Sequence, residues 1–329
     1  MAKTLKHIKE ASIEINGACN YSCPSCPQSA GREIDFKKSL PLDLYQKILN
    51  DLKSHGCTSI SLQGSGEPFL QRNVGEYIER ATALGIDTHI ITNGSMLDES
   101  IAEDCVRAGL NSIRFSILGF DADTYRVNMG TSFDIEQTLA NIERFIVISK
   151  GLKSECRVSL YHLIIPSELS ISEQVQRYKE LSASLDVEIE IWHSHNWAGR
   201  NPSSTTIDRS YGVRRSCGRP QAEYLTVRAG GSKGFRAAVV PCCFVLGRDS
   251  EAELGNLEMN TIQEVLDSTL YQELLEAHRK NEYAGVAYCE GCDQLYETKE
   301  ALVWSNSPTR VQGLSHTASR EKPVRFIES

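Results

Sequence analysis

The chain has 329 residues, a formal net charge of −8, 40% hydrophobic and 24% charged residues, and eleven cysteines. It has neither the run of about 20 apolar residues that a membrane span needs nor a basic surplus, so we expect neither a membrane nor nucleic acid as a partner. Because no secretory signal pattern opens the chain, the cysteines predict metal binding in the cytoplasm rather than disulfides.

Apolar strand-like runs alternate with amphipathic helical patterns from residue 11 to about residue 195. The expected strands lie near 12–16, 59–62, 87–91, 112–117, 157–164 and 187–192. The expected helices lie near 41–55, 73–84, 98–108, 134–150 and 170–184. Pro41 suits the first position of the helix expected near 41–55. Gly85 and Gly109 suit the positions that follow the helices expected near 73–84 and 98–108. These βα units predict a parallel sheet with right-handed crossovers, either doubly wound or barrel-like.

The loop after the first expected strand carries the most informative motif. Cys19, Cys23 and Cys26 stand there in the run C-N-Y-S-C-P-S-C. Three thiolates on one short loop suit three irons of a [4Fe–4S] cluster and leave the fourth iron open, whereas a closed electron-transfer cluster normally has four cysteines. A structural zinc site is the alternative, because zinc also takes closely spaced cysteines.

A second motif, Gln63-Gly-Ser-Gly-Glu-Pro68, follows the second expected strand. A carboxylate beside glycines can accept hydrogen bonds from an ammonium group that approaches the backbone closely. Together the two motifs resemble the signature of the radical S-adenosylmethionine (radical SAM) superfamily, and they disfavour zinc at the first cysteine run. The resemblance implies a partial (β/α)6 barrel, a catalytic cluster on the first three cysteines, and SAM held through the Gly66 backbone and the Glu67 side chain.

Two further strand ends are similar to the same family pattern. Asn93 lies in a T-N-G turn after the third expected strand, and Ser116 ends the fourth. The resemblance implies that both contact SAM, although such a turn and such a serine are also common without a ligand. Ser25 departs from the pattern, because relatives often have an aromatic residue there that packs near the adenine.

The last third of the chain holds a second set of cysteines: Cys217, Cys242, Cys243, Cys289 and Cys292. A CxxC pair with two distant cysteines is typical of a zinc ribbon, a redox pair or a cluster. A hairpin with Gly230-Gly231, the run Pro241-Cys-Cys243, the segment 254–257 and a helix over 261–279 resemble the SPASM/twitch extension of radical SAM enzymes. The resemblance implies one auxiliary [4Fe–4S] cluster with Cys217, Cys242, Cys289 and Cys292 as ligands, and structural zinc stays the alternative. Cys243 is interpreted as a packing residue or a hydrogen-atom donor.

We therefore expect an α/β fold with three parts. Residues 1–200 form the partial barrel, residues 201–304 form a small α+β twitch/SPASM-like domain, and residues 305–329 form a polar tail. The residues from 196 to 204 have the composition of a linker. Cys57, Cys105 and Cys156 are interpreted as small hydrophobic residues of the core.

The resemblance implies a 5′-deoxyadenosyl radical that removes a hydrogen atom from a polar small molecule, with reduction by a flavodoxin- or ferredoxin-type donor. Oxidation of an alcohol to a ketone, with the auxiliary cluster as electron acceptor, is the first hypothesis. Epimerisation with Cys243 as hydrogen donor and radical decarboxylation are the next two. Peptide maturation is less favoured, because only 18 residues precede Cys19 and many such relatives have an amino-terminal domain for a leader peptide. A structural or sensor protein with clusters or zinc is the non-catalytic alternative.

An alcohol oxidation also needs a base. His193 and His195 follow the sixth expected strand, at the barrel mouth, and are our candidate bases; His162 lies on the fifth strand. Strand-end histidines can equally be hydrogen-bonded parts of the turn into the linker. Arg157, Glu188 and Glu190 are further polar candidates for the interior of an open barrel.

Overall fold

Six parallel strands form the centre of the molecule, which a computed structural model describes for residues 6–30, 38–201, 214, 216–245, 252–295 and 302–307. Their order is β6-β5-β4-β3-β2-β1. The bounds are β1 Glu10–Ile13, β2 Ser59–Leu62, β3 Asp87–Thr92, β4 Ser112–Ser116, β5 Arg157–Ile164 and β6 Glu188–His193. All six lie where the sequence predicts strands, with β1 shifted toward the amino end.

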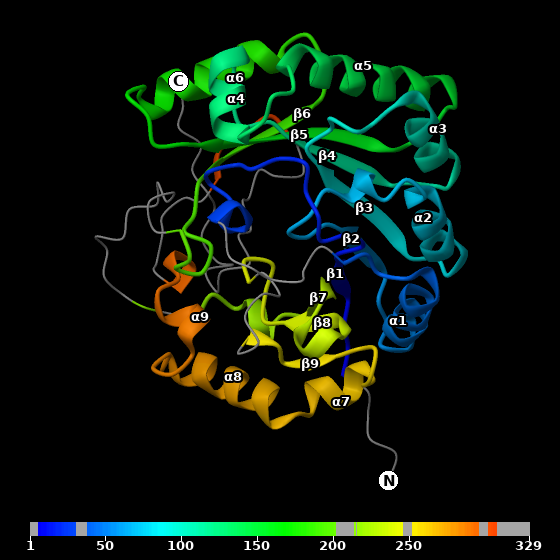
Figure 1. Ribbon diagram of the computed structural model, residues 1–329, viewed down its shortest axis with the longest axis vertical. Coiled ribbons are helices and arrows are strands. Elements are labelled where there is room, and N and C mark those ends of the chain that lie inside the picture. Colours follow the sequence, from blue (N-terminus) through cyan, green and yellow to red (C-terminus); the bar gives the residue numbers. More distant parts are fainter. Residues whose placement is uncertain are drawn as a thin grey trace.

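Six helices cover the outer face of this curved sheet (Figure 1). They are α1 Leu42–Ser54, α2 Val74–Ala83, α3 Glu99–Arg107, α4 Ala122–Met129, α5 Ile135–Gly151 and α6 Ile171–Ser182. Pro41 directly precedes α1 instead of occupying its first position. Gly85 and Gly109 have φ of +63° and +92°, the left-handed conformation that glycine adopts readily after a helix. The α/β fold with a partial (β/α)6 barrel is therefore confirmed.

Alternation along the strands separates an apolar outer side from a polar inner side. On β4, Ile113 and Phe115 are fully buried, and the Phe115 ring meets Phe145 of α5 edge to face at 6.3 Å. The half-buried residues that alternate with them on β4, among them Arg114 and Ser116, point to the opposite side. We call that concave side, away from the helices, the inner face.

The second region continues the same sheet. Strand β7 (Tyr224–Gly230) pairs in parallel with β1, and β8 (Arg236–Val240) and β9 (Gly255–Asn256) follow in antiparallel pairing. Figure 1 shows α7 (Ile262–Leu266) and α8 (Thr269–Lys280) below these strands. The expected hairpin is therefore present. The expected single helix over 261–279 is instead two helices, because Ser268 caps a new amino terminus through its side chain.

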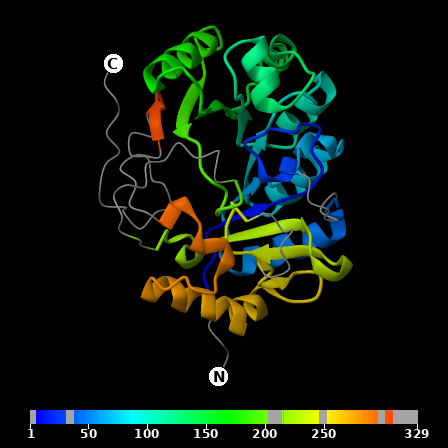
Figure 2. The same cartoon turned by 60° about the vertical axis from the view of Figure 1, so that its left-hand side comes forward.

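A last strand closes the other edge of the sheet. Strand β10 (Leu302–Ser305) lies antiparallel beside β6, as Figure 2 also shows. The predicted boundaries near residues 200 and 304 stay predictions, and most of the predicted tail lies outside the described residues. No helix in the described part of the chain is long and apolar enough to cross a membrane.

Candidate radical site and auxiliary cluster site

The first cysteine motif forms a tight loop after β1. The amide of Cys26 donates to the carbonyl of Cys23 at 2.9 Å, and the amide of Tyr21 donates to the Cys19 sulfur at 3.4 Å. Burial raises the pKa of Cys19 to about 12, with further contributions from nearby Glu67 and Cys26, against a lowering hydrogen bond from Tyr21. Burial likewise raises the pKa of Cys23, and Cys26 and Cys19 add to it. The three thiols therefore lie together, and a bound cation would favour their thiolate forms.

The end of α4 supports this loop from outside the motif. The Cys23 thiol donates to the carbonyl of Met129 at 3.3 Å, and the Ser22 amide donates to that of Gly130 at 3.2 Å. Gly130 has φ of +54°, and a Cβ atom there would lie 2.1 Å from the Ser22 oxygen. No larger residue fits this contact without moving the cysteine loop.

The second motif lies directly against the first. A Cβ atom on Gly66 would approach the backbone oxygens of Asn16 and Ala18 at 2.1 and 2.6 Å, so a glycine is needed there. The Glu67 amide donates to the Ala18 carbonyl at 2.8 Å. The backbone of the Gln63–Pro68 motif is thus hydrogen-bonded to the segment that leads into the first three cysteines.

The Glu67 carboxylate is buried and already accepts hydrogen bonds from its own chain. Its oxygens accept from the amide of Phe69 at 3.0 Å, the hydroxyl of Thr92 at 2.6 Å and the amide of Asn93 at 2.8 Å. Burial raises the pKa of Glu67, and these three bonds lower it. A carboxylate has about four acceptor positions, so one remains for an ammonium group.

Asn93 and Ser116 lie at the ends of neighbouring strands. The Asn93 side chain donates to Asn20 of the cysteine loop at 3.0 Å, and its oxygen accepts from the amide and hydroxyl of Ser95. Ser116 is half-buried and lies opposite Tyr161 in the β4–β5 register. Asn93 thus holds the loop geometry directly, and contact of either side chain with SAM stays a prediction.

The second cysteine set converges from three parts of the chain. Cys217 precedes the short helix Arg219–Gln221, Cys242 follows β8, and Cys289 lies on α9 (Ala287–Glu290), with Cys292 just beyond it. Burial raises the pKa of Cys289, and the neighbouring thiols of Cys242, Cys217 and Cys292 raise it further. Burial also raises the pKa of Cys242 to about 12, with Cys243 as the next cause. Four cysteines from distant segments, three buried and Cys242 partly exposed, therefore share one site.

The all-cysteine donor chemistry of this set suits an iron-sulfur cluster. Within the described ranges, no three Cys, His, Asp or Glu side chains gather closely enough to hold one metal ion. One zinc ion draws its thiolates in to about 2.3 Å, whereas each cysteine of a [4Fe–4S] cluster binds a different iron. Both cysteine sets therefore suit clusters.

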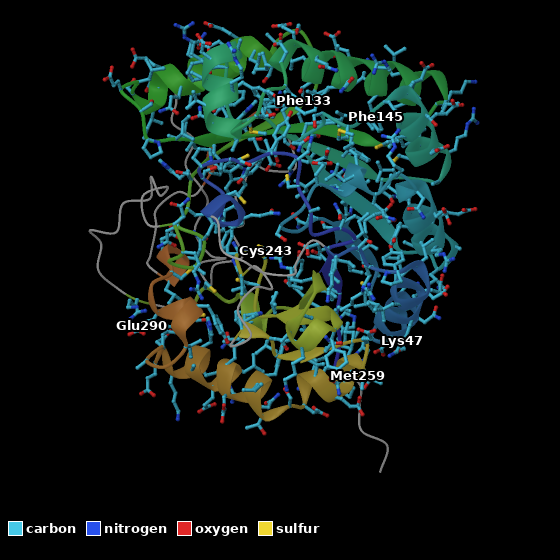
Figure 3. All side chains as sticks on the ribbon, viewed as in Figure 1. Lys47, Phe133, Phe145, Cys243, Met259 and Glu290 are labelled. Atoms are coloured by element: carbon cyan, nitrogen blue, oxygen red, sulfur yellow. The ribbon has the colours of Figure 1, made fainter. Side chains whose placement is uncertain are left out.

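Cys243 lies beside this second set and near the middle of the molecule (Figure 3). Nη1 of Arg219 donates to its sulfur at 3.5 Å, and the same guanidinium lies over the Phe244 ring at 4.5 Å. Sequence reasoning missed Arg219, because an arginine two residues after a cysteine has no distinctive pattern. The free cysteines Cys57 and Cys105 are buried as expected, whereas Cys156 is partly exposed.

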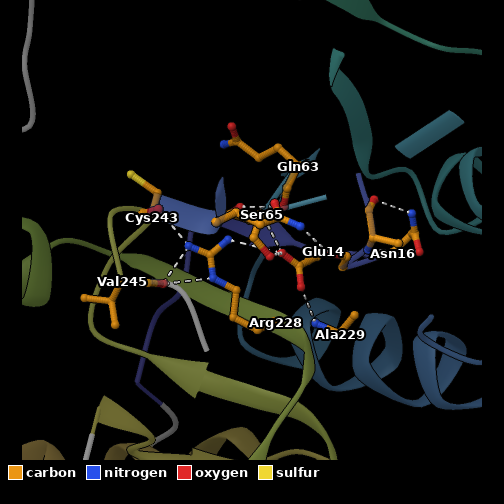
Figure 4. Close-up of polar contacts among 12 residues, drawn as sticks. Glu14, Asn16, Gln63, Ser65, Arg228, Ala229, Cys243 and Val245 are labelled. Carbon is orange, nitrogen blue, oxygen red and sulfur yellow. Dashed lines mark hydrogen bonds and ion pairs between the residues drawn. The ribbon is translucent and has the colours of Figure 1, made fainter. Parts of the chain in front are cut away.

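A buried ion pair connects the two halves of the molecule (Figure 4). Glu14 follows β1, Arg228 lies on β7, and their Oε2 and Nη1 atoms are 3.6 Å apart with both side chains 2% exposed. Glu14 also accepts from the Ser65 amide, from the Ser65 hydroxyl at 2.7 Å and from the Ala229 amide at 3.1 Å. Arg228 donates to the carbonyl of Cys243 at 2.7 Å and to that of Val245 at 3.0 Å through Nε. The Gln63–Pro68 motif and the loop after β8 that carries Cys243 (the Cys243 loop) are thus joined through two charged side chains.

A second charged group lies on the inner face of the barrel. Arg114 on β4 and Glu190 on β6 form an ion pair at 3.3 Å, and the Arg114 guanidinium lies 5.6 Å from the Tyr161 ring centre. Trp192 donates to the other Glu190 oxygen at 2.9 Å. Burial raises the pKa of Tyr161, with electrostatic contributions from Arg114, Glu190, Cys243 and Arg219. The inner face and the Cys243 loop therefore share one polar environment.

The histidines differ in their surroundings. His162 faces α6, where its nitrogens contact the Ile117 carbonyl at 2.7 Å and the Ser182 hydroxyl at 3.2 Å, and burial lowers its pKa to about 4. His195 lies between aromatic rings, with Phe244 at 4.0 Å, and burial, then Arg219, lowers its pKa to about 3. His193 is half-buried, and burial lowers its pKa. Because side chains alternate along β6, the His193 side chain lies on the outer side of the strand and the Glu190 side chain on the inner side. Glu190 is therefore the better placed acidic or basic group for chemistry on the inner face.

The chain matches known proteins in two segments. Residues 13–166 match the Radical SAM superfamily, and residues 217–293 match the SPASM iron-sulfur cluster-binding domain. The GTP 3′,8-cyclase of Desulforamulus reducens is 26% identical over 138 residues, which cover 41% of this chain and 42% of the cyclase. The match therefore spans less than half of that relative.

Two solved structures share the fold over most of the chain. BtrN in complex with AdoMet and 2-DOIA has a TM-score of 0.56 and 16% identity, covering 88% of this chain and 94% of BtrN. Streptococcus suis SuiB bound to the precursor peptide SuiA has a TM-score of 0.64 and 14% identity, covering 99% of this chain and 76% of SuiB. Such low identities show the fold alone. With its two domain matches, the chain therefore carries a radical SAM domain and a SPASM domain, a combination that implies SAM, a catalytic [4Fe–4S] cluster and an auxiliary cluster as cofactors.

Proposed function

We propose that this enzyme oxidises an alcohol group of a polar small molecule, such as a sugar or aminocyclitol, to a ketone. The observation that carries the proposal is the shared environment of the Arg114–Glu190 pair, Tyr161 and the Cys243 loop. A charged and aromatic inner face suits a substrate with several hydroxyl or amino groups.

In this proposal, SAM and the clusters supply a 5′-deoxyadenosyl radical and an electron-accepting centre. The Arg114–Glu190 pair orients the substrate hydroxyl. The carbinol carbon gives its hydrogen atom to the radical, the hydroxyl gives its proton to a base, and one electron leaves for the auxiliary cluster, so that the C=O bond forms. Removal of the hydrogen atom makes the hydroxyl far more acidic, and the Glu190 carboxylate, which pairs with Arg114, is the candidate acceptor of its proton. A flavodoxin- or ferredoxin-type partner supplies and removes electrons.

Epimerisation is the second candidate, because the Cys243 thiol lies near the same inner face. The substrate radical would take a hydrogen atom from that thiol on the opposite face. Decarboxylation has no such observation in its favour, and peptide maturation has only the likeness in fold to SuiB bound to its precursor peptide.

The test is a reaction of the reconstituted enzyme in D₂O with SAM, a reductant and a panel of sugars and aminocyclitols. We expect 5′-deoxyadenosine together with a product two hydrogens lighter and free of deuterium. A product of substrate mass with one deuterium would establish the epimerase, and loss of CO₂ the decarboxylase. Cys243→Ala should leave the oxidation intact, but it would stall an epimerase after hydrogen abstraction. Glu190→Gln should slow ketone formation more than His193→Gln does; the reverse order would make His193 the base.

A further inference from the structure

Arg219 is a cation with an unusual set of neighbours. It begins the short helix Arg219–Gln221, two residues after Cys217, and its guanidinium lies over the Phe244 ring. Its Nε atom is buried, and within the described part of the chain it has no hydrogen-bond partner. A buried guanidinium N–H without an acceptor costs free energy, so this orientation points to an acceptor that the polypeptide does not supply.

The groups around this cation are sulfur atoms rather than carboxylates. Nη1 donates to the Cys243 sulfur at 3.5 Å. The guanidinium also lies close enough to interact electrostatically with the thiolates of Cys242, Cys217 and Cys292. Among the described residues, no Asp or Glu forms an ion pair with it. Its positive charge is therefore directed at the auxiliary cysteines.

We propose that Arg219 is a charge-setting residue, which raises the reduction potential of the auxiliary cluster and so allows it to accept the electron of the substrate radical. The inference rests on the proposed function and adds a named cause for the direction of electron flow. A cluster that gains an electron becomes more negative, and a nearby cation that is partly shielded from solvent stabilises that state. The accepted electron leaves through the flavodoxin- or ferredoxin-type partner, so the redox balance closes.

Arg214 offers a matched control. It is also an arginine near this cysteine set, since it lowers the pKa of Cys289 as the last of several causes. Its guanidinium, however, lies 5.2 Å from the Tyr283 ring and donates to the Glu290 carbonyl in an exposed contact. Arg219 interacts electrostatically with four cysteines of the set, whereas Arg214 is the last cause at one of them. Arg214→Gln therefore removes the same charge with a smaller effect on the cluster.

The experiment is a redox titration monitored by electron paramagnetic resonance. It uses a full-length Cys19/Cys23/Cys26→Ala background that retains only the auxiliary cluster. Arg219→Gln should move the midpoint potential to a more negative value at unchanged iron content. Arg219→Lys should recover part of the shift, and Arg214→Gln should change little.

An unchanged potential in Arg219→Gln with full iron would overturn the proposal. Loss of iron in both Arg219 variants would also overturn it, because Arg219 would then act in building the site. An equal shift in Arg214→Gln would contradict a specific role for Arg219. If the potential shifts as expected but no alcohol in the panel is oxidised, the proposed reaction fails while the role of Arg219 stands.

Discussion

At the scale of single residues, the two buried charges of Glu14 and Arg228 are the least expected feature. Each interrupts an apolar strand-like run, Ala11–Asn16 in one case and Tyr224–Gly230 in the other. That interruption is a signal that sequence analysis can use, since a charge in a buried strand requires a partner. It does not reveal the partner, because the two residues are far apart in the chain and meet only through the pairing of β1 with β7.

We predict that Arg228→Met destabilises the protein by about 3–5 kcal/mol, because Glu14 would keep a buried, unpaired charge. The Glu14→Gln/Arg228→Met double variant should lose less than the sum of the two single variants. Denaturant-induced unfolding of the four proteins measures this coupling. Arg126→Met is the control, since its pair with Asp123 is exposed and should contribute less than about 1 kcal/mol. Additive losses in the cycle would show that the pair is not energetically coupled.

In the candidate site, too, some residues can be predicted from their spacing in the sequence and others cannot. Cysteine spacing and the G-S-G-E-P run predict the two sites because their ligands are close in sequence or follow a family order. Arg114 and Arg219 carry no such pattern, since their roles depend on which side of a strand or helix they occupy. The histidines show the opposite error: His193 and His195 are candidate bases by their residue type, but the surroundings of His195 are apolar.

At the scale of elements, periodicity predicted the six barrel strands and five of the six barrel helices. It did not predict α4, whose buried residues are only Tyr125 and Met129 and whose apolar stripe is therefore weak. Nor did it predict that β7 and β10 would join the barrel sheet, because pairing between distant strands leaves no local trace. The missed helix matters, since its end holds the cysteine loop.

We predict that Gly130→Ala weakens the first cysteine site. The left-handed conformation and the contact with Ser22 together should cost about 1–3 kcal/mol, and relief of the contact would displace the loop of Cys23. The iron retained at the first cysteine site, measured by EPR after desalting, should fall. The rate of 5′-deoxyadenosine formation should fall with it. Gly151→Ala is the control, because its added Cβ meets nothing within 4 Å. Equal behaviour of the two variants would remove α4 from the support of the site.

At the scale of the whole molecule, the two cysteine sets predict two clusters in one chain. Anaerobic reconstitution should give about eight irons per chain, falling to about four in the Cys19/Cys23/Cys26→Ala variant. About four irons falling to none, with zinc retained, would mean that the rear cysteines are structural. The electron-accepting role of the auxiliary site, and with it the proposed oxidation, would then lose its basis.

Strands β7 and β10 flank the six parallel strands on opposite sides, which has a consequence for how the protein is made. The six parallel strands are complete once residue 193 has been synthesised, yet β1 and β6 still lack their outer neighbours. Unpaired edges of this kind invite association with other chains. A nascent chain on the ribosome therefore passes through a stage in which its amino-terminal half is formed but exposed at both edges. That stage ends only when the last strand emerges, so a fragment cut near residue 200 should aggregate rather than persist as a separate barrel.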